Sequence, residues 1–212
     1  MRMLPSGSTA LLLELDDLDE VLGWHAALIA DPPLGVVDVV PAARTVLIVI
    51  DPATTDLDAL RRSVAALRPR PATSAGAPLL EIPVVYDGED LGDVAELLEC
   101  DVAEVVARHT ATAWRVAFCG FMPGFGYLTT DPDAARSARH TWDLPRRRTP
   151  RTRVPPGAVA LAGEFTGVYP RASPGGWQLV GRTELQVFDP AREPAALLAP
   201  GTPVRFVAVG AS

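Results

Sequence analysis

The sequence contains no lysine and no asparagine, so arginine supplies all 19 of its basic residues. The absence of lysine excludes several chemistries for this chain alone. A P-loop requires a lysine on the β- and γ-phosphates, a protein kinase requires a strand lysine, and Schiff-base catalysis requires an amine. The basic groups available to this protein are therefore guanidinium groups and, at most, three histidines.

Cysteine and histidine are scarce as well. Cys100 and Cys119 are too few for a disulfide framework or a CxxC site, and the histidines show no HxH or HxxxH spacing. We expect both thiols to be buried bystanders in a reduced compartment, and we expect no metal site in this chain.

Long apolar runs are also missing. No run approaches the roughly 20 residues that span a bilayer, and residues 1–10 lack the basic start and the apolar stretch of a signal peptide. These absences predict a cytoplasmic protein with no membrane partner.

Charge is distributed unevenly along the chain. The formal net charge is -7, yet residues 136–182 hold nine arginines against only Asp143 and Glu164. A basic segment within an acidic protein favours an anionic ligand or an acidic partner surface. It argues against nucleic-acid binding, which needs a positive field over a whole domain. A solvated arginine loop is the alternative.

The N-terminal part of the chain predicts a small α/β domain. Apolar spacing and acidic capping residues indicate the order β-α-β-β-α, at residues 9–15, 16–30, 35–40, 44–51 and 56–67. This order is most of a split βαβ unit, in which helices cover one face of an antiparallel sheet.

A proline-rich connection, RPRPATSAGAP at residues 68–78, separates this domain from the rest of the chain. We therefore expect two domains, 1–78 and 79–212. The next apolar run, residues 79–87, predicts a strand. If that strand returns to complete the first sheet, the boundary extends to about residue 88.

The second domain should contain two short helices within residues 90–109, with Asp101 capping the second and Glu104 following as in a capping box. Acidic residues at that helix start argue against a DNA-binding helix-turn-helix. From Trp114 onward, short apolar runs alternate with glycine and proline, which predicts a closed barrel or compact sandwich. The expected strands lie in WRVAFCG, GAVALAG, TGVYP, GWQLVG, LQVFDP and the sealing run PVRFVAVG.

The polar groups of residues 149–183 form the strongest candidate site. They are Arg151, Arg153, Glu164, Tyr169, Gln178 and Arg182. Arginine forks match a carboxylate or phosphate, and Gln178 beside Trp177 offers an amide donor and acceptor at an apolar wall. Barrel turns with incidental polar residues are the alternative.

The segment AFCGFMPGFGYL, residues 117–128, is too apolar for an ordinary loop and too rich in glycine for an ordinary strand. We expect residues 120–126 to turn across the barrel mouth. Phe121, Pro123 and Phe125 would then wall the pocket whose polar side comes from residues 149–182, unless the aromatic rings simply fill the core.

No nucleophile stands out, and the catalytic residues stay unknown. Ser173 lacks the first glycine of G-x-S-x-G, and Cys119 has no adjacent cation to activate it. His109 is the best placed histidine, because a cation is favoured at the C-terminus of a helix. We expect it to cap the helix or to contribute to the site.

Several separate motifs, in order, are similar to those of one family: GFMPGFGYL (120–128), TPRTRVPPGAVALAGE (149–164), TGVYP (166–170) and SPGGWQLVGRT (173–183), with STALLLEL and GVVDVVPAARTVLIVID near the N-terminus. Together they resemble the family of the 5-oxoprolinase B subunit, also called allophanate hydrolase subunit 1, of the carboxyltransferase subdomain C/D type. The family also contains the inhibitor of the sporulation kinase KinA.

The resemblance implies an α+β protein, with a small α/β N-terminal domain followed by a cyclophilin-like β-barrel. It implies two partners: a second carboxyltransferase-like subunit (the 5-oxoprolinase C subunit, or allophanate hydrolase subunit 2) and the 5-oxoprolinase A subunit. Such a complex hydrolyses a C–N amide bond, opening 5-oxoproline to glutamate with ATP, and this chain is expected to be inactive alone. ATP is then a cofactor of the complex.

Two alternatives to the hydrolase subunit stay open: a non-catalytic protein that inhibits a histidine kinase, and a prolyl isomerase. A closed pocket where Arg153, Gln178 and Arg182 converge would favour the enzyme, whereas an exposed apolar groove without arginines would favour the inhibitor. Phe165 departs from the glutamine that the resemblance leads us to expect, which removes a polar group from the pocket rim.

Overall fold

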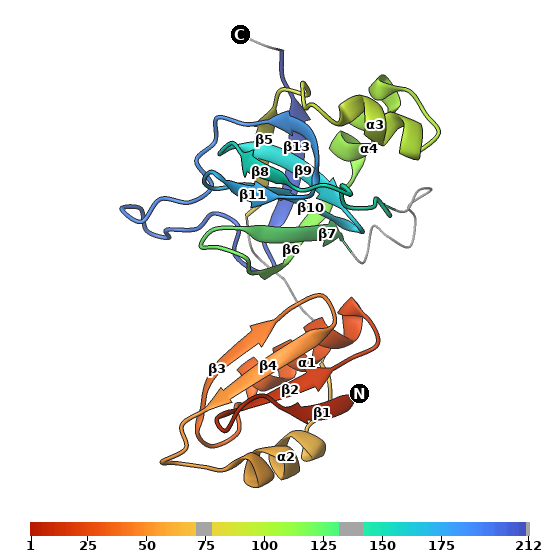
Figure 1. Cartoon of the computed structure of the whole chain (residues 1–212). Helices are drawn as coiled ribbons and strands as arrows, with labels where there is room; N and C mark the ends of the chain where they lie inside the picture. The colour runs from red at the N-terminus through yellow and green to blue at the C-terminus, as the bar shows by residue number, and fades with distance from the viewer. Residues whose placement is uncertain (71–77, 132–141, 211–212) are drawn as a thin grey trace. The chain divides into compact units, whose positions relative to one another are not determined.

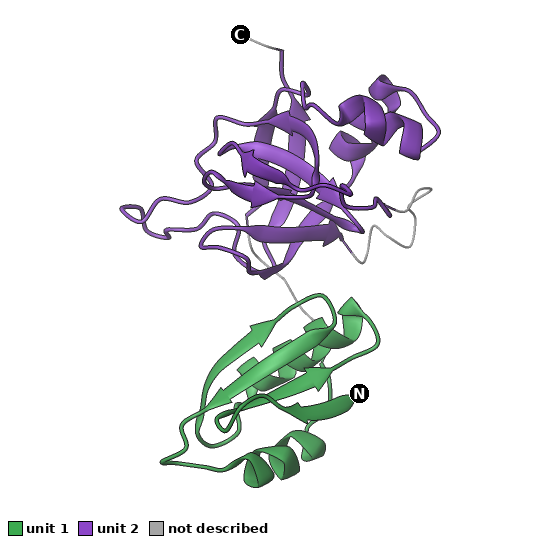
Figure 2. Ribbon diagram, in the orientation of Figure 1, with its two compact units in different colours: residues 1–73 green, residues 74–212 purple. Residues whose placement is uncertain are grey.

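The computed structural model describes residues 1–70, 78–131 and 142–210. The chain forms two compact units, Met1–Thr73 and Ser74–Ser212 (Figure 2). Each unit buries its own set of apolar side chains.

The first unit is built on a four-stranded antiparallel sheet with the order β1-β2-β4-β3 (Figure 1). Its strands are β1 (Arg2–Pro5), β2 (Ala10–Glu14), β3 (Val36–Pro41) and β4 (Thr45–Ile50). Val46, Ile48 and Ile50 are buried because alternate side chains of a strand point to the same face. The short edge strand β1 was not predicted, since its residues are mostly exposed and show no apolar alternation.

Two capped helices complete this unit, α1 (Leu18–Ala30) and α2 (Leu57–Ala66). The Asp17 carboxylate accepts a hydrogen bond from the backbone N–H of Glu20 at 2.9 Å, and Asp56 does the same for Ala59 at 2.7 Å. Each aspartate satisfies an N–H that would have no partner in the first turn. Helix α1 packs against β3 and β4, and α2 packs against β2. All five predicted elements are present.

The second unit is a barrel formed by a seven-stranded sheet with the order β12-β9-β10-β7-β6-β13-β5. Val85, just after β5, exchanges two backbone hydrogen bonds of 2.9 Å with Arg182 at the end of β12, which brings the two edges together. The strands are β5 (Leu80–Val84), β6 (Trp114–Cys119), β7 (Gly126–Thr130), β9 (Ala158–Ala162), β10 (Phe165–Val168), β12 (Gln178–Arg182) and β13 (Pro203–Ala208). The expected barrel is confirmed.

Strand β13 seals the barrel as predicted, because it pairs antiparallel with β6 and parallel with β5. Strand β5 therefore belongs to the second unit, and the alternative that it returns to the first sheet is wrong. The run LQVFDP, residues 185–190, is not a strand either. It lies in a long loop in which Val187 is buried and Phe188 forms a single bridge with Ala196.

Strand β9 is buried on both faces and separates two apolar clusters. Val159 and Leu161 belong to the main core with Trp114 and Phe206. The alternate residues of β9 belong to a second cluster with Phe125, Tyr169 and Trp177. Val154, from the two-stranded ribbon of β8 (Arg151–Val154) and β11 (Ser173–Gly175), joins this second cluster.

The two predicted short helices, α3 (Leu91–Leu97) and α4 (Val102–Ala111), lie beside each other next to the barrel (Figure 1). Asp101 caps α4 by accepting the Glu104 backbone N–H at 2.7 Å. The Glu104 side chain binds Arg108 at 2.7 Å. The predicted cap is therefore confirmed, and Glu104 contributes an i,i+4 ion pair to the helix.

Gly157 marks a turn that admits no side chain. Its φ is +78°, and a Cβ built there would lie 2.2 Å from the backbone oxygen of Thr183. We expect Gly157→Ala to lower the free energy of unfolding by about 2 kcal/mol, measured by urea denaturation. Gly92→Ala is the control, because Gly92 lies in α3 with open space around it, and alanine should stabilise the helix by up to about 1 kcal/mol. Equal unfolding midpoints for the two variants would contradict this account.

Candidate functional site

An open groove of about 720 Å³ lies between α3 and the segment that precedes β8. Its volume is in the range typical of small-molecule sites. The groove is lined by Asp93, Glu96 and Leu97 of α3, by Pro145, Arg146, Arg147, Arg148 and Thr149, and by Gln178 of β12. One wall is therefore acidic, and the facing wall carries three consecutive arginines from the basic segment.

Asp90 binds Arg147, one of the arginines that line this groove. It stands at the N-cap of α3 but makes no side-chain capping bond. Its carboxylate, 1% exposed, accepts two hydrogen bonds of 2.8 Å from Arg151, one of 2.7 Å from the Leu179 backbone N–H, and one from Arg147. Charge-assisted bonds of this kind are stronger than neutral ones. Asp90 thus ties α3 to β8 and β12 and fixes Arg147 at the groove.

The carboxylate of Asp90 stays ionised despite its burial. Burial is the largest single influence and raises the pKa of Asp90. The hydrogen bonds from Arg151 and Leu179, together with the positive charges of Arg151 and Arg147, outweigh burial and bring the pKa below its ordinary value. The arginines are therefore held by a full negative charge at neutral pH.

Gln178 and Arg147 are held next to each other by two contacts. The Gln178 side-chain NH₂ donates to the carbonyl oxygen of Pro145 at 3.0 Å, and the Arg147 backbone N–H donates to the carbonyl oxygen of Gly176 at 2.8 Å. These contacts place residues 145–147 alongside residues 176–178. The side chains of Gln178 and Arg147 therefore reach the groove from two backbone segments that are hydrogen-bonded to each other.

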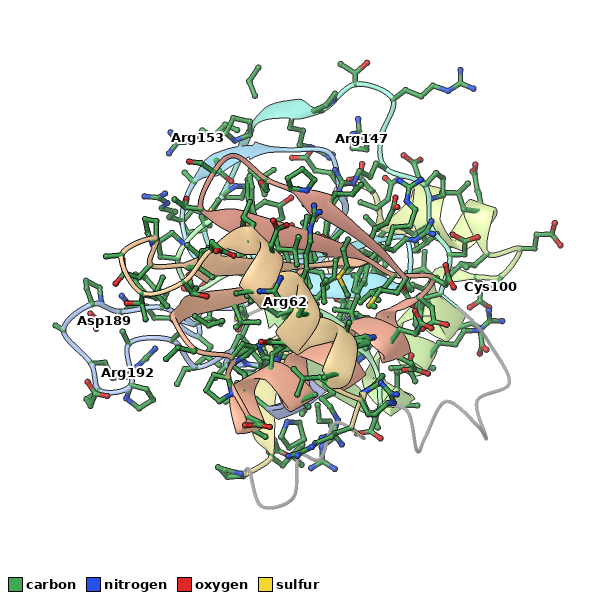
Figure 3. The ribbon with its side chains drawn as sticks, turned by 90° about the horizontal axis from the view of Figure 1, so that it is seen from below. Arg62, Cys100, Arg147, Arg153, Asp189 and Arg192 are labelled. Carbon is green, nitrogen blue, oxygen red and sulfur yellow. The ribbon has the colours of Figure 1, made fainter. Side chains whose placement is uncertain are left out.

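The remaining predicted arginines do not line the groove. Arg151 is bound instead to Asp90 and Glu89. Arg153 is exposed on β8, and Figure 3 shows it well apart from Arg147, which lies nearer to α3 and α4. Arg182 is at the far end of β12 from Gln178, about 13 Å along the strand. Arg153, Gln178 and Arg182 therefore do not converge.

Arg182 forms its ion pairs at the other end of the barrel. Its guanidinium pairs with Asp87 at 2.9 Å and with Glu184 at 3.4 Å, close to the Val85 bridge. Glu164 lies exposed in the turn between β9 and β10. These two residues belong to the barrel rim rather than to the groove.

The aromatic segment separates into a core part and a surface part. Phe125 is buried and contacts Tyr169 and Trp177 edge to face, at ring-centre distances of 5.2 and 5.4 Å. Phe121 is 59% exposed, adopts a φ of +65°, and packs edge to face on Phe125 at 5.6 Å. Pro123 is exposed in the same turn. None of these residues lines the groove, and Phe121 extends the buried aromatic cluster to the surface.

His109 is completely buried in the barrel core. Its Nδ1 lies 2.7 Å from the Tyr86 hydroxyl and its Nε2 lies 3.0 Å from Oγ1 of Thr166. Thr166 donates its only hydroxyl proton to the carbonyl oxygen of Ala160 at 3.1 Å. The proton of His109 therefore resides on Nε2, while Nδ1 accepts from Tyr86.

The prediction that His109 is a cation at the helix end is wrong. Burial lowers the pKa of His109 to about 3, so the ring is neutral at physiological pH. It packs on the ring of Phe206 at 4.4 Å and does not line the groove. Its role is to satisfy polar groups inside the core.

Neither the Cys119 thiol nor a metal-binding cluster within the described residues contributes to this site. The Cys119 thiol donates to the carbonyl oxygen of Leu198 at 3.0 Å, and burial raises its pKa, which disfavours the thiolate. Across residues 1–70, 78–131 and 142–210, no group of three or more His, Cys, Asp or Glu side chains is placed to hold a metal ion. Within the same ranges, no helix has the length and apolar content needed to cross a membrane.

Comparison with known proteins identifies the family. The sequence matches the family described as carboxyltransferase domain, subdomain C and D, over residues 1–198. The chain belongs to this family. The resemblance read from its motifs is thereby confirmed.

Three relatives of this carboxyltransferase family member show how far the similarity extends. The B subunit of 5-oxoprolinase from Escherichia coli O157:H7 is 40% identical over 210 residues, which is 95% of this chain and 93% of the relative. The crystal structure of TTHA0988 superposes with a TM-score of 0.75 at 36% identity, over 97% of this chain and 40% of that chain. The urea amidolyase of K. lactis shares the fold alone, with a TM-score of 0.72 at 20% identity over 99% of this chain and 16% of that chain.

Sequence reasoning missed Asp90 as the residue that organises the groove. Its arginine partners lie 57 and 61 residues later, and its backbone partner lies 89 residues later. In the sequence Asp90 has the position of an ordinary helix cap. The signal that could have pointed to it is indirect: the clustered arginines at 146–148 and 151 require acidic partners from elsewhere in the chain.

Proposed function

We propose that this protein is one subunit of an ATP-dependent amide hydrolase of the 5-oxoprolinase type, which opens 5-oxoproline to glutamate. The observation that carries the proposal is the 40% identity to a 5-oxoprolinase B subunit over nearly the full length of both chains. The groove supports it independently, because three arginines beside a buried amide side chain suit a small carboxylate that also carries an amide.

The reaction breaks the C–N bond of the lactam and adds water across it. ATP transfers its γ-phosphoryl group to the lactam carbonyl oxygen and leaves as ADP, which makes the carbonyl carbon a better electrophile. Water then attacks this carbon, the C–N bond breaks, and phosphate is released. The residues of this chain act by binding and orientation: Arg147 and its neighbours bind the carboxylate and stabilise negative charge, while Gln178 orients the amide. Asp90 acts as a positioning residue, since it holds Arg147 and does not itself line the groove.

We assign ATP to the complex, and a chain without lysine cannot itself form a P-loop. The partners in this proposal are a second carboxyltransferase-like protein, corresponding to the 5-oxoprolinase C subunit, and the 5-oxoprolinase A subunit. The designation of the relative as a B subunit, together with the greater length of the TTHA0988 chain, supports an assembly with further parts. The groove does not decide between this proposal and a histidine-kinase inhibitor: its walls are charged rather than apolar, but Arg153, Gln178 and Arg182 do not converge in it.

Reconstitution tests this proposal. The chain is co-expressed with the two partner subunits, the complex is purified, and glutamate released from 5-oxoproline is measured with and without ATP. We expect ATP-dependent release only when all three subunits are present. Release that is unchanged when this chain is omitted, or no release from the complete complex, would overturn the proposal.

The exposed ring of Phe121 provides a separate prediction for the complex. Aromatic residues, phenylalanine included, are enriched at protein interfaces, so we propose that Phe121 contacts another subunit. Because 59% of the residue is already in water, we expect Phe121→Ala to lower the free energy of unfolding by less than about 1 kcal/mol. Turnover of the complex should fall several-fold, measured by the same glutamate assay. A large loss of stability that accounts for the lost turnover would instead make Phe121 a core residue.

A further inference from the structure

The sheet of the first unit has two unlike faces. One face is buried and carries Leu11, Leu13, Val46, Ile48 and Ile50. Helices α1 and α2 supply the apolar side chains that cover it, and Figure 1 shows α1 behind the sheet. The opposite face, made by the alternate residues of the same strands, is accessible to solvent.

The accessible face carries a continuous apolar row. The register places Leu4 opposite Leu12, Leu12 opposite Leu47, and Leu47 opposite Val40, so the row crosses all four strands. Leu4 and Val40, at the two ends, are 37% and 38% exposed, and Leu12 and Leu47 are half-buried. Single exposed apolar residues are ordinary on a protein surface, but a row of four large ones is typical of a contact surface.

Two opposite charges stand at diagonal corners of this face. Arg2 lies on β1 two residues before Leu4, and Asp38 lies on β3 two residues before Val40. Because β1 and β3 run in opposite directions, the two charged residues lie on opposite sides of the apolar row. Both are exposed. The face therefore has a cation at one corner and an anion at the corner diagonally across from it.

We propose that this face binds the same face of a second copy of the chain, with Arg2 of each copy paired to Asp38 of the partner subunit. A two-fold interface requires a patch that is its own complement. The apolar row meets its own copy, and the diagonal corners bring a cation against an anion twice. Arg2 pairs with Glu14 within one copy, but its guanidinium has five donors and can bind a second carboxylate.

The positions of the corners set the angle between the two sheets. Arg2 and Asp38 are separated by three strand spacings across the sheet, about 14 Å, and by four residues along it, also about 14 Å. The diagonal that joins them therefore lies at about 45° to the strands, and a two-fold axis perpendicular to it crosses the strands of the two copies at about 90°. Orthogonal packing is one of the two regular ways in which sheets stack face to face.

The size of the face limits the strength of this contact. Four strands about 4.8 Å apart and five residues about 3.4 Å apart span roughly 19 by 17 Å. Such a face buries less than the roughly 800 Å² per partner of a standard interface, so association is weak. We expect a dimer with a dissociation constant on the order of 10–100 µM, measured on the full chain alone by sedimentation velocity between about 1 and about 500 µM.

Mixing two charge-reversal variants tests the diagonal pairing. Arg2→Asp sets two carboxylates against each other at both corners, and Asp38→Arg sets two guanidinium groups against each other. Each variant alone should dimerise at least about 10-fold more weakly than wild type. An equimolar mixture should recover an affinity within about threefold of wild type, because each mixed dimer again has a cation against an anion at both corners. Recovery on mixing also shows that both variants are folded.

Arg62→Asp and Asp58→Arg are the matched controls, because they make the same charge changes at exposed positions of α2, where Figure 3 shows Arg62. Neither should change the dimer affinity. A wild-type chain that stays monomeric over the whole concentration range would overturn the proposal and leave the face to a different protein. A dimer that persists in both charge-reversal variants, or a mixture that stays as monomeric as its components, would overturn it as well.

Discussion

Asp90→Ala is expected to lower the free energy of unfolding of the second unit by about 3 kcal/mol. The substitution leaves Arg147 and the Leu179 N–H without their acceptor and leaves Arg151 with only the exposed Glu89. The loss lies at the lower end of the range for a broken buried ion pair, because both arginines reach solvent. Urea denaturation followed by tryptophan fluorescence measures it, since three of the four tryptophans belong to this unit.

Asp93→Ala is the matched control for this experiment. Asp93 lies three residues further along, is exposed, and lines the same groove. We expect its removal to change the free energy of unfolding by less than about 0.5 kcal/mol. Equal free energies of unfolding for Asp90→Ala and Asp93→Ala would show that the carboxylate of Asp90 does not hold α3, β8 and β12 together.

His109 is expected to make the second unit lose stability as the pH falls. Its pKa is about 3 in the folded state and about 6.5 when unfolded. Protons therefore bind the unfolded chain first, and the stabilisation is fully present above pH 6.5 and lost as the pH falls below it. Between about pH 8 and pH 4.5 this single group lowers the free energy of unfolding by about 3 kcal/mol.

His109→Gln tests this dependence, because glutamine retains one donor and one acceptor but does not titrate. The comparison is the difference in unfolding free energy between pH 8 and pH 4.5, for wild type and variant. We expect the variant to lose most of the wild-type slope over this range. Burial also lowers the pKa of His25, but His25 is present in both wild type and His109→Gln, so its contribution is common to the two proteins. Equal slopes would mean that His109 is protonated inside the fold.

Much of the fold could be predicted because it depends on local patterns. The buried alternation of β4 and the aspartate caps of α1, α2 and α4 are each visible within a few residues. The edge strand β1 and the ribbon of β8 and β11 were not, because short strands with exposed residues carry no periodic signal. The partner of β5 also could not be predicted, since it pairs with β13 more than a hundred residues later.

The arrangement of the candidate site could not be predicted from the sequence. Of the predicted site residues only Gln178 lines the groove, next to three arginines of the basic segment. Which arginines face the groove could not be read from the sequence, because Arg147 and Arg153 differ only in what lies across from them in the folded chain. His109 was wrongly predicted to be a cation. The helix dipole favours a cation at an exposed helix end, but in the core the cost of desolvating the charge is larger and keeps the ring neutral.

Asp90 determines how the arginines are arranged at the groove. A carboxylate at the start of α3 fixes the two arginines that the chain presents beside β12, and it leaves Gln178 and Arg147 with unmet hydrogen-bonding requirements in the same groove. The function of the complex should therefore depend on Arg147 far more than on arginines elsewhere on the barrel.

The most direct measurement compares Arg147→Met with Arg153→Met in the reconstituted complex. Both variants replace one arginine with the same side chain, but only Arg147 lines the groove. We predict that kcat/KM for ATP-dependent glutamate release falls at least about 10-fold with Arg147→Met and stays within about twofold of wild type with Arg153→Met, at equal recovery of the complex. Equal activities for the two variants, or a greater loss with Arg153→Met, would contradict the assignment of the groove as the functional site.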